Sequence, residues 1–178
     1  MTDAPARRTR RITEDDPSSG FRSGVHALDD YFQRHAVGND YVGIGRAYVM
    51  EAAAEELAAG LPAIVGFYTL SMASVVSRLA SLVGHKLPRY PMPVALIGRL
   101  AVDERARGRR LGEALLLDAL ARVVKASEVV GCLGIIVDAK DEDAAGFYEK
   151  YDFVTLDPSE WPRRMFLAIQ VARAAFAE

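Results

Sequence analysis

The stretch from Ile97 to Gly112, IGRLAVDERARGRRLG, decides how this 178-residue chain can fold. An apolar, strand-like run ends at Val102, a basic loop surrounds Gly108, and an apolar helical pattern begins at Leu111. Backbone N–H groups at a helix N-terminus point at an anion, and the helix dipole favours negative charge there. The stretch therefore predicts a phosphate-binding loop, with a solvated basic turn as the alternative.

The loop differs from the two commonest nucleotide motifs. It contains neither G-x-x-x-x-G-K-[ST] nor G-x-G-x-x-G, so ATP and NAD are not the expected ligands. Guanidinium groups suit phosphate oxygens because they offer several donors in a fixed plane. The loop carries four of them: Arg105, Arg107, Arg109 and Arg110.

A second informative stretch runs from Ile135 to Phe153, IIVDAKDEDAAGFYEKYDF. It reads as a strand, an acidic turn that suits a helix start, and a short helix carrying Phe147-Tyr148-Glu149. The two stretches, in this order, resemble the GNAT superfamily of N-acetyltransferases. The resemblance implies an α/β GNAT fold: a mixed, mostly antiparallel sheet, splayed at a central parallel strand pair and flanked by helices, with acetyl-CoA in the opening.

The resemblance also implies which residues hold acetyl-CoA. The family's pyrophosphate loop is Q/R-x-x-G-x-G/A, and Arg107, Arg110 and Gly112 fall on its fixed places, with Arg110 where glycine is usual. The family binds pantetheine through the backbone at the end of the central strand. The implied cofactor-binding residues are Leu100, Ala101, Val102, Arg107, Gly108, Arg109, Arg110, Leu111 and Gly112.

The second stretch resembles the family's A-x-x-F-Y-E-x-x-G-F ending, with Asp152 in place of the glycine. Aspartate tolerates a left-handed backbone, so the turn can survive this change. Tyr148 is the implied catalytic residue. A phenol with a pKa of about 10 stays protonated at pH 7 and can donate to a departing thiol of pKa about 8.5. The alternative is that Tyr148 only packs.

Further segments narrow the resemblance to one branch of the family. They are FRSGVHALDDYF from Phe21, VGFYTL from Val65, LPRYPMPVALIGRLAVD from Leu87, and Val137-Asp-Ala139. This series is similar to the acetyltransferase toxins of type II toxin–antitoxin systems, which acetylate the α-amine of aminoacyl-tRNA and stop translation. The similarity runs from about Phe21 to about Ile169. It implies aminoacyl-tRNA as substrate and a ribbon-helix-helix antitoxin as partner, and we also expect a homodimer.

No glutamate or histidine stands out as a general base. An α-amine titrates near pKa 8 and a lysine amine near 10.4, so a neutral α-amine costs roughly 3 kcal/mol less to supply. The missing base is therefore compatible with aminoacyl-tRNA. Candidate side chains for an RNA groove, with scattered solvated charges as the alternative, are Arg22, Arg34, Arg46, Lys86, Arg89 and Arg99.

Two other functions fit the same sequence. One is a GNAT enzyme for a small amine or a protein N-terminus; the other is a non-catalytic module that binds acyl-CoA as a structural ligand. The net charge of −2 argues against a broadly basic surface, although it leaves a local basic groove open.

Composition suits one globular domain, because 51% of the residues are hydrophobic. We expect a single domain over residues 20–178, preceded by a flexible basic tail over residues 1–19. Cys132 reads as a buried core thiol, and the scattered histidines give no metal-binding spacing. No signal peptide or run of roughly 20 apolar residues is found, so the cytoplasm is the expected location.

Apolar periodicity predicts the remaining elements. A helix is expected after Gly24 with Ser23 as its N-cap, and residues 51–60 form either a helix or a hairpin loop with a helical turn. The central strand, over residues 94–102, and the strand over residues 133–137 should be parallel. Further strands are expected over 45–51, 63–71, 153–156 and 165–171, and helices over 74–82, 111–124 and 143–151.

Overall fold

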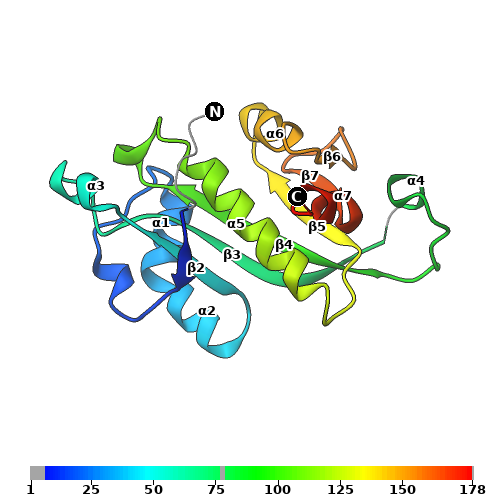
Figure 1. Cartoon of the computed structure of the whole chain (residues 1–178), viewed down its shortest axis with the longest axis horizontal. Coiled ribbons are helices and arrows are strands. Elements are labelled where there is room, and N and C mark those ends of the chain that lie inside the picture. The colour runs from blue at the N-terminus through cyan, green and yellow to red at the C-terminus, as the bar shows by residue number, and fades with distance from the viewer. Residues whose placement is uncertain (1–6, 77–78, 178) are drawn as a thin grey trace. The chain divides into compact units, whose positions relative to one another are not determined.

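The computed structural model describes residues 7–76 and 79–177. Seven strands form one sheet in the order β1-β2-β3-β4-β5-β7-β6 (Figure 1). The strands are β1 (Thr9–Arg11), β2 (Arg46–Glu51), β3 (Ile64–Val75), β4 (Met92–Val102), β5 (Gly134–Ala139), β6 (Val154–Thr155) and β7 (Arg163–Ala168). The helices are α1 (His26–Arg34), α2 (Ala36–Val42), α3 (Ala54–Ala58), α4 (Ala80–Val83), α5 (Leu111–Ala126), α6 (Glu142–Glu149) and α7 (Ile169–Ala175), with 3-10 turns η1 (Asp16–Ser18) and η2 (Glu104–Ala106).

The expected parallel pair lies in the middle of the sheet. Residues 95–97 of β4 pair in parallel with residues 135–137 of β5, while β1–β2, β2–β3, β5–β7 and β6–β7 are antiparallel. The predicted fold class, a mixed and mostly antiparallel α/β sheet flanked by helices, is confirmed. The splay of the sheet beyond the parallel pair stays a prediction.

The chain forms two compact units, and strands β3 and β4 and helix α5 each contribute to both. Unit 1 comprises residues 1–71 and 99–119, and unit 2 comprises residues 72–98 and 120–178. The expectation of one domain over residues 20–178 stays a prediction.

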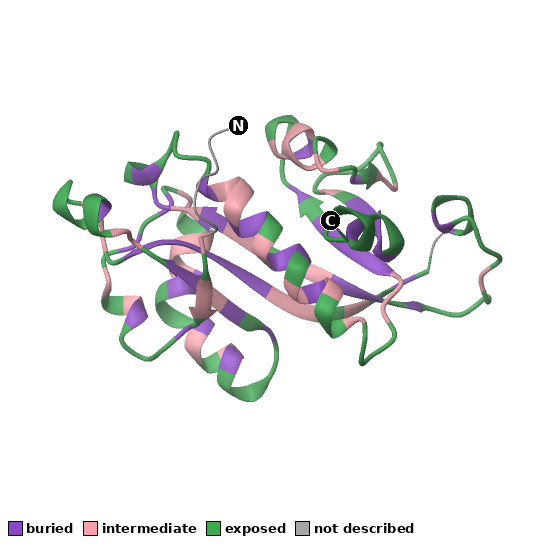
Figure 2. Ribbon diagram, viewed as in Figure 1, coloured by how far each residue is buried: buried purple, intermediate pink, exposed green. Residues whose placement is uncertain are grey.

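Aromatic rings fill the core of unit 1. The rings of Phe21 and Phe32 lie 4.9 Å apart, and Phe67 meets them at 5.5 and 4.9 Å. Tyr31 stacks on Phe67 at 6.5 Å. Figure 2 shows the buried residues concentrated along the strands. This cluster joins α1 to the inner strands because each ring buries a large apolar surface.

Unit 2 is held by close packing between β5 and β7. A Cβ atom added at Gly134 would lie 2.4 Å from Leu167 O and 2.4 Å from the ring of Phe166. Only glycine therefore fits at the start of β5. Phe166 and Ile136 belong to the same buried cluster.

Two predicted elements differ from those observed. The helix expected over residues 74–82 is reduced to α4, because β3 continues to Val75, whose side chain is buried in the unit 2 core; residues 77–78 lie outside the described residues. The strand expected to Val171 ends at Ala168, and α7 follows. Ile169 and Ala172 are buried three residues apart, which is the spacing of a helix face.

The basic N-terminal segment also differs from the flexible tail that we expected. Thr9–Arg11 forms β1 and pairs with β2. Arg10 donates two hydrogen bonds to Asp16, at 2.8 and 2.9 Å, and Arg11 pairs with Asp40. These arginines are ordered because they neutralise buried carboxylates. Residues 1–6 of the expected tail lie outside the described residues.

We predict that unit 1 loses stability in acid. Burial alone raises the pKa of Asp40, but hydrogen bonds from Arg11 and the Ala47 N–H outweigh it, so this pKa lies below its ordinary value. The pKa values of Asp16 and Asp103 are lowered in the same way, because hydrogen bonds from arginine side chains and backbone N–H groups outweigh the effect of burial. A carboxyl whose pKa is lower in the folded than in the unfolded chain stabilises the fold above about pH 4, and this stabilisation is lost as pH falls further.

Thermal unfolding should therefore show a falling Tm below about pH 4. Asp40→Asn should lower Tm at pH 7 and reduce the fall between pH 5 and pH 3, because that ionisation is gone. An equal Tm at pH 5 and pH 2.5 in the unmodified protein would contradict this account.

Candidate active site

The loop between β4 and α5 lies entirely in unit 1 and has a left-handed backbone at two positions. Gly108 has φ +81° and Arg110 has φ +58°. Left-handed φ favours glycine because a Cβ atom crowds the backbone there. Glycine is usual in the family at the place of Arg110, and the observed φ gives the physical reason. In this chain the left-handed turn is made with an arginine in that position.

A buried carboxylate fixes the start of the loop. Asp103 has no exposed surface and accepts hydrogen bonds from the N–H groups of Arg22 and Arg105, both at 2.9 Å. The Arg105 guanidinium adds two bonds to it at 2.9 Å and donates to Gly20 O at 2.7 Å. Arg105 therefore binds the protein itself, although the sequence suggested a phosphate donor.

Arg107 is likewise turned toward its own chain. Its Nη2 donates to Ser23 O at 3.0 Å. Arg110 has an 81% exposed side chain and pairs with Glu113 at 2.6 Å. Arg109 is 43% exposed, with Nη1 4.0 Å from Glu56 Oε2. The loop's arginines thus divide into two that shape it and two that face solvent.

Helix α5 begins directly after these residues. The N–H of Ala114 donates to Arg110 O at 3.2 Å. By helix geometry the N–H groups of Leu111, Gly112 and Glu113 have no intrahelical acceptor. Leu111 is 4% exposed, so the first turn of the helix is anchored within unit 1 by a buried side chain. The helix start can therefore offer backbone donors to an anion.

The end of β4 leads into this loop. Ala101 is buried in the aromatic core of unit 1, while Leu100 and Val102 are half-buried. The Asp103 N–H donates to Val65 O at 2.8 Å, which ties the strand end to β3. The sequence placed the pantetheine contacts on these three residues, and the structure puts them on one short strand segment before the loop.

Tyr148 lies in unit 2 on α6. Its ring packs 5.2 Å from Phe147 and 5.5 Å from Phe153, and Asp141 caps the helix by accepting from the Ala144 N–H at 2.9 Å. Asp152 has φ +68°, so aspartate does adopt the left-handed turn expected of it. Burial, and then the charge of Asp138, raises the pKa of Tyr148 to about 12. The phenol is protonated at neutral pH.

Asp138 and Arg164 form an ion pair in unit 2 that the sequence analysis missed. They face each other across β5 and β7, with Nε–Oδ1 at 2.9 Å and Nη2–Oδ2 at 3.0 Å. Asp138 is the charged residue near the end of an otherwise apolar strand, and this was the available signal. The pair fixes the position of the Asp138 carboxylate, whose negative charge adds to burial in raising the pKa of Tyr148.

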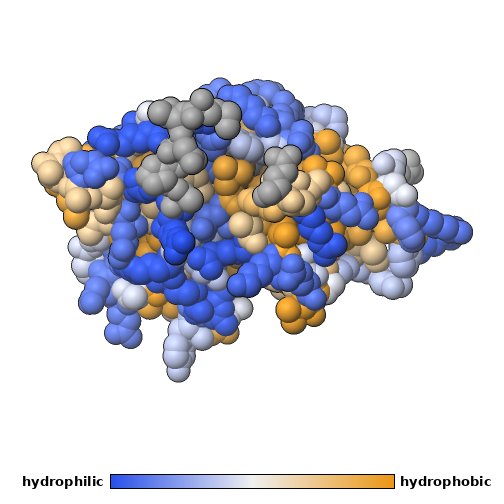
Figure 3. All heavy atoms as spheres, in the orientation of Figure 1, coloured by the Kyte–Doolittle hydropathy of each residue, from blue (hydrophilic) through white to orange (hydrophobic). Residues whose placement is uncertain are grey.

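Four of the candidate RNA-binding residues have partners in unit 1. Arg34 pairs with Asp30 at 3.2 Å, and the Arg99 guanidinium lies 3.5 Å from the centre of the Tyr31 ring. Arg22 pairs with Glu104 at 2.6 Å, and Arg46 with Asp40 at 3.8 Å. On the face seen in Figure 3, strongly hydrophilic residues gather over β1.

The other two candidates, Lys86 and Arg89, belong to unit 2. Both are exposed in the segment between α4 and β4. The six basic residues are thus distributed over both units. A common RNA groove stays a prediction.

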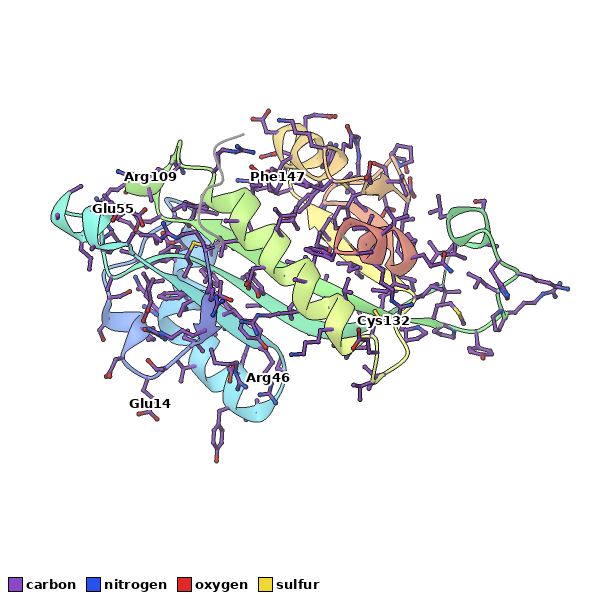
Figure 4. All side chains as sticks on the ribbon, in the orientation of Figure 1. Glu14, Arg46, Glu55, Arg109, Cys132 and Phe147 are labelled. Atoms are coloured by element: carbon purple, nitrogen blue, oxygen red, sulfur yellow. The ribbon has the colours of Figure 1, made fainter. Side chains whose placement is uncertain are left out.

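Other predicted features can be located as well. Cys132, which is labelled in Figure 4 and was expected to be a buried thiol, is half-buried, and burial raises its pKa. In the part of the chain that the structure describes, no three histidine, cysteine, aspartate or glutamate side chains are grouped to hold a metal ion. Across residues 7–76 and 79–177, no helix has the length and apolar character needed to cross a membrane.

Comparison with known proteins identifies close relatives. Over 170 residues the chain is 36% identical to a tRNA-acetylating toxin of Mycobacterium tuberculosis (strain ATCC 25618 / H37Rv), covering 95% of this chain and 96% of the relative. AtaT complexed with acetyl-methionyl-tRNAfMet superposes with a TM-score of 0.79 at 26% identity, covering 95% and 98% of the two chains. An AtaT tyrosine-to-phenylalanine mutant toxin bound to the C-terminus of the antitoxin AtaR superposes with a TM-score of 0.78 at 25% identity. This superposition covers 97% of this chain and 99% of the AtaT chain.

The family model of the acetyltransferase (GNAT) domain matches residues 45–155, which is more than half of the chain. The matched range contains the β4–α5 loop and Tyr148. The chain therefore belongs to the GNAT acetyltransferase family.

Proposed function

We propose that this acetyltransferase is a toxin that transfers the acetyl group of acetyl-CoA to the α-amine of aminoacyl-tRNA. The similarity to a tRNA-acetylating toxin over 95% of the chain is the observation that carries the proposal. Relatives of the same fold were solved with acetyl-methionyl-tRNA and with an antitoxin. Aminoacyl-tRNA and an antitoxin are accordingly the proposed partners. The ribbon-helix-helix type of antitoxin, the homodimer and the cytoplasmic location stay predictions.

The loop of unit 1 supplies the groups that would hold the phosphates. The free N–H groups at the start of α5 provide donors in a favourable dipole, and the solvent-facing guanidiniums of Arg109 and Arg110 provide positive charge. Arg107, Gly108 and Leu111 set the shape of the loop, and Gly112 offers backbone to a close ligand. The backbone of Leu100, Ala101 and Val102 would hydrogen-bond pantetheine.

Tyr148 is the proposed proton donor to the leaving thiolate. A phenol of pKa about 12 and a thiol of pKa about 8.5 in water differ by roughly 5 kcal/mol, which alone would make the transfer unfavourable. The burial that raises the phenol pKa also raises that of a thiol placed beside it. The two groups are therefore better matched in the site than in water. Burial, together with the charge of Asp138, keeps the proton on Tyr148 until the thiolate forms.

The nature of the amine relieves the need for a strong base. An α-amine loses its proton near pH 8, so a substantial neutral fraction exists at physiological pH. Water can accept the proton of such an amine. This chemistry favours aminoacyl-tRNA over lysine side chains as the acceptor.

Two arginine substitutions should separate phosphate binding from loop architecture. Arg110→Ala should weaken acetyl-CoA binding about tenfold, by loss of a charge-assisted contact, with little change in Tm because the side chain is exposed. Arg107→Ala should lower Tm because it removes the bond to Ser23 O. Calorimetric titration and thermal unfolding measure the two effects. Unchanged affinity in Arg110→Ala would show that this side chain does not contact phosphate.

Tyr148→Phe should keep the fold and acetyl-CoA binding but reduce turnover about a hundred- to ten-thousandfold, the usual contribution of general acid catalysis. Because the pKa of Tyr148 is about 12, the rate of the unmodified enzyme should show no decline from phenol ionisation up to pH 10. Phe147→Leu is the matched packing control. Full turnover in Tyr148→Phe would assign Tyr148 a packing role only.

Charged tRNA incubated with labelled acetyl-CoA and the protein should become labelled on the α-amine of its amino acid. Transfer should fall as salt rises, because phosphate contacts release counterions. Free amino acids should react poorly since they lack the RNA that positions the amine. Rapid acetylation of spermidine or a lysine peptide, with none on charged tRNA, would overturn the toxin assignment and leave the fold intact.

A further inference from the structure

One carboxylate in unit 1 is buried beside the loop and has an incomplete set of partners. Glu56 on α3 is 2% exposed. Its Oε1 accepts from the Ala53 N–H at 2.8 Å and from Arg7 Nη2 at 2.7 Å. Burial raises the pKa of Glu56, but the Ala53 N–H, Arg7 and Arg109 together lower it below its ordinary value. Glu56 is therefore ionised at neutral pH.

The second oxygen of Glu56 has no hydrogen-bond partner among the described residues. The Nη1 atom of Arg109 lies 4.0 Å away from it. A buried oxygen without a donor is unfavourable, so the Arg109 guanidinium is drawn toward it. Figure 4 shows Arg109 and the neighbouring Glu55 at the same end of unit 1.

We infer that Glu56 is a positioning residue that holds the Arg109 guanidinium in place for the phosphates of acetyl-CoA. The inference rests on the proposed role of the β4–α5 loop. Arginine has much rotamer freedom, and a side chain that is already restrained loses less of it when ligand binds. At 4.0 Å the contact restrains Arg109 without occupying its donors, and the side chain remains 43% exposed.

Arg7 determines whether the charge of Glu56 favours or opposes the binding of phosphate. A lone carboxylate beside a phosphate site would repel the ligand. Glu56, however, already makes an ion pair with Arg7 at 2.7 Å, so its charge is largely compensated. The positive charge of Arg109 therefore remains available to phosphate. The N-terminal segment thus acts on the β4–α5 loop through the Glu56 carboxylate, which contacts both Arg7 and Arg109.

A double-mutant cycle with acetyl-CoA as the titrant tests this inference. Glu56→Gln should weaken binding roughly threefold to tenfold, as expected for an ion pair between a buried carboxylate and a half-exposed, ligand-binding arginine. In an Arg109→Ala background the same change should have no further effect, because two residues in one interaction are not additive. KM for acetyl-CoA should rise more than kcat falls. Glu55→Gln, which removes an exposed charge from the adjacent position, should bind like the unmodified protein.

The remaining outcomes separate this inference from the proposed function. Equal effects of Glu56→Gln in both backgrounds, or binding at least as tight as in the unmodified protein, would overturn the role of Glu56. Absence of acetyl-CoA binding in the unmodified protein would instead overturn the function of the loop. Should Glu56→Gln not fold, Arg7→Ala provides the test: it leaves Glu56 uncompensated and free to draw Arg109 inward, so affinity should fall severalfold. Unchanged affinity in a folded Arg7→Ala would overturn the inference.

Discussion

The loop before α5 depends on one interaction, the burial of the Asp103 carboxylate among four hydrogen bonds. An isolated buried charge is very costly, so Asp103 is stable only with the Arg105 guanidinium and the two N–H groups of Arg22 and Arg105 around it. Those bonds join the end of β4 to the segment before α1. Arg107 adds a bond to Ser23 O in the same segment. The positions of Gly108 to Gly112, and hence of the helix N–H groups, follow from this anchor.

This arrangement explains why the loop contains more arginines than a phosphate requires. A guanidinium binds carboxylates, carbonyls and phosphates through the same planar set of donors, so sequence alone does not distinguish these uses. Arg105 and Arg107 satisfy acceptors within the protein, whereas Arg109 and Arg110 keep exposed donors. Arg10 and Arg11 of the N-terminal segment likewise bind buried carboxylates of the protein.

Most of the fold could be predicted, because apolar periodicity and ordered motifs carry it. The strands around Ala95 and Ile135 and the long helix from Leu111 were expected close to where they lie. The order of β1 could not be foreseen, since its arginines are stabilised by Asp16 and Asp40 from elsewhere in the sequence. The other two differences between the expected and observed elements lie near Val75 and Ile169. The short apolar runs there suit a helix or a strand equally well, and the observed element is the one that buries their side chains in the core.

The sequence motifs propose the residues of the candidate site but not the surroundings of those residues. The motif points to Tyr148 and the loop, but the environment of the phenol depends on burial and on Asp138, which is ten residues away in sequence. Asp138 is held by Arg164 from β7, and this pairing follows from strand register rather than from any local pattern. The register of β5 and β7 therefore fixes the position of the Asp138 charge, which adds to burial in raising the pKa of Tyr148 and so keeps the phenol able to donate its proton.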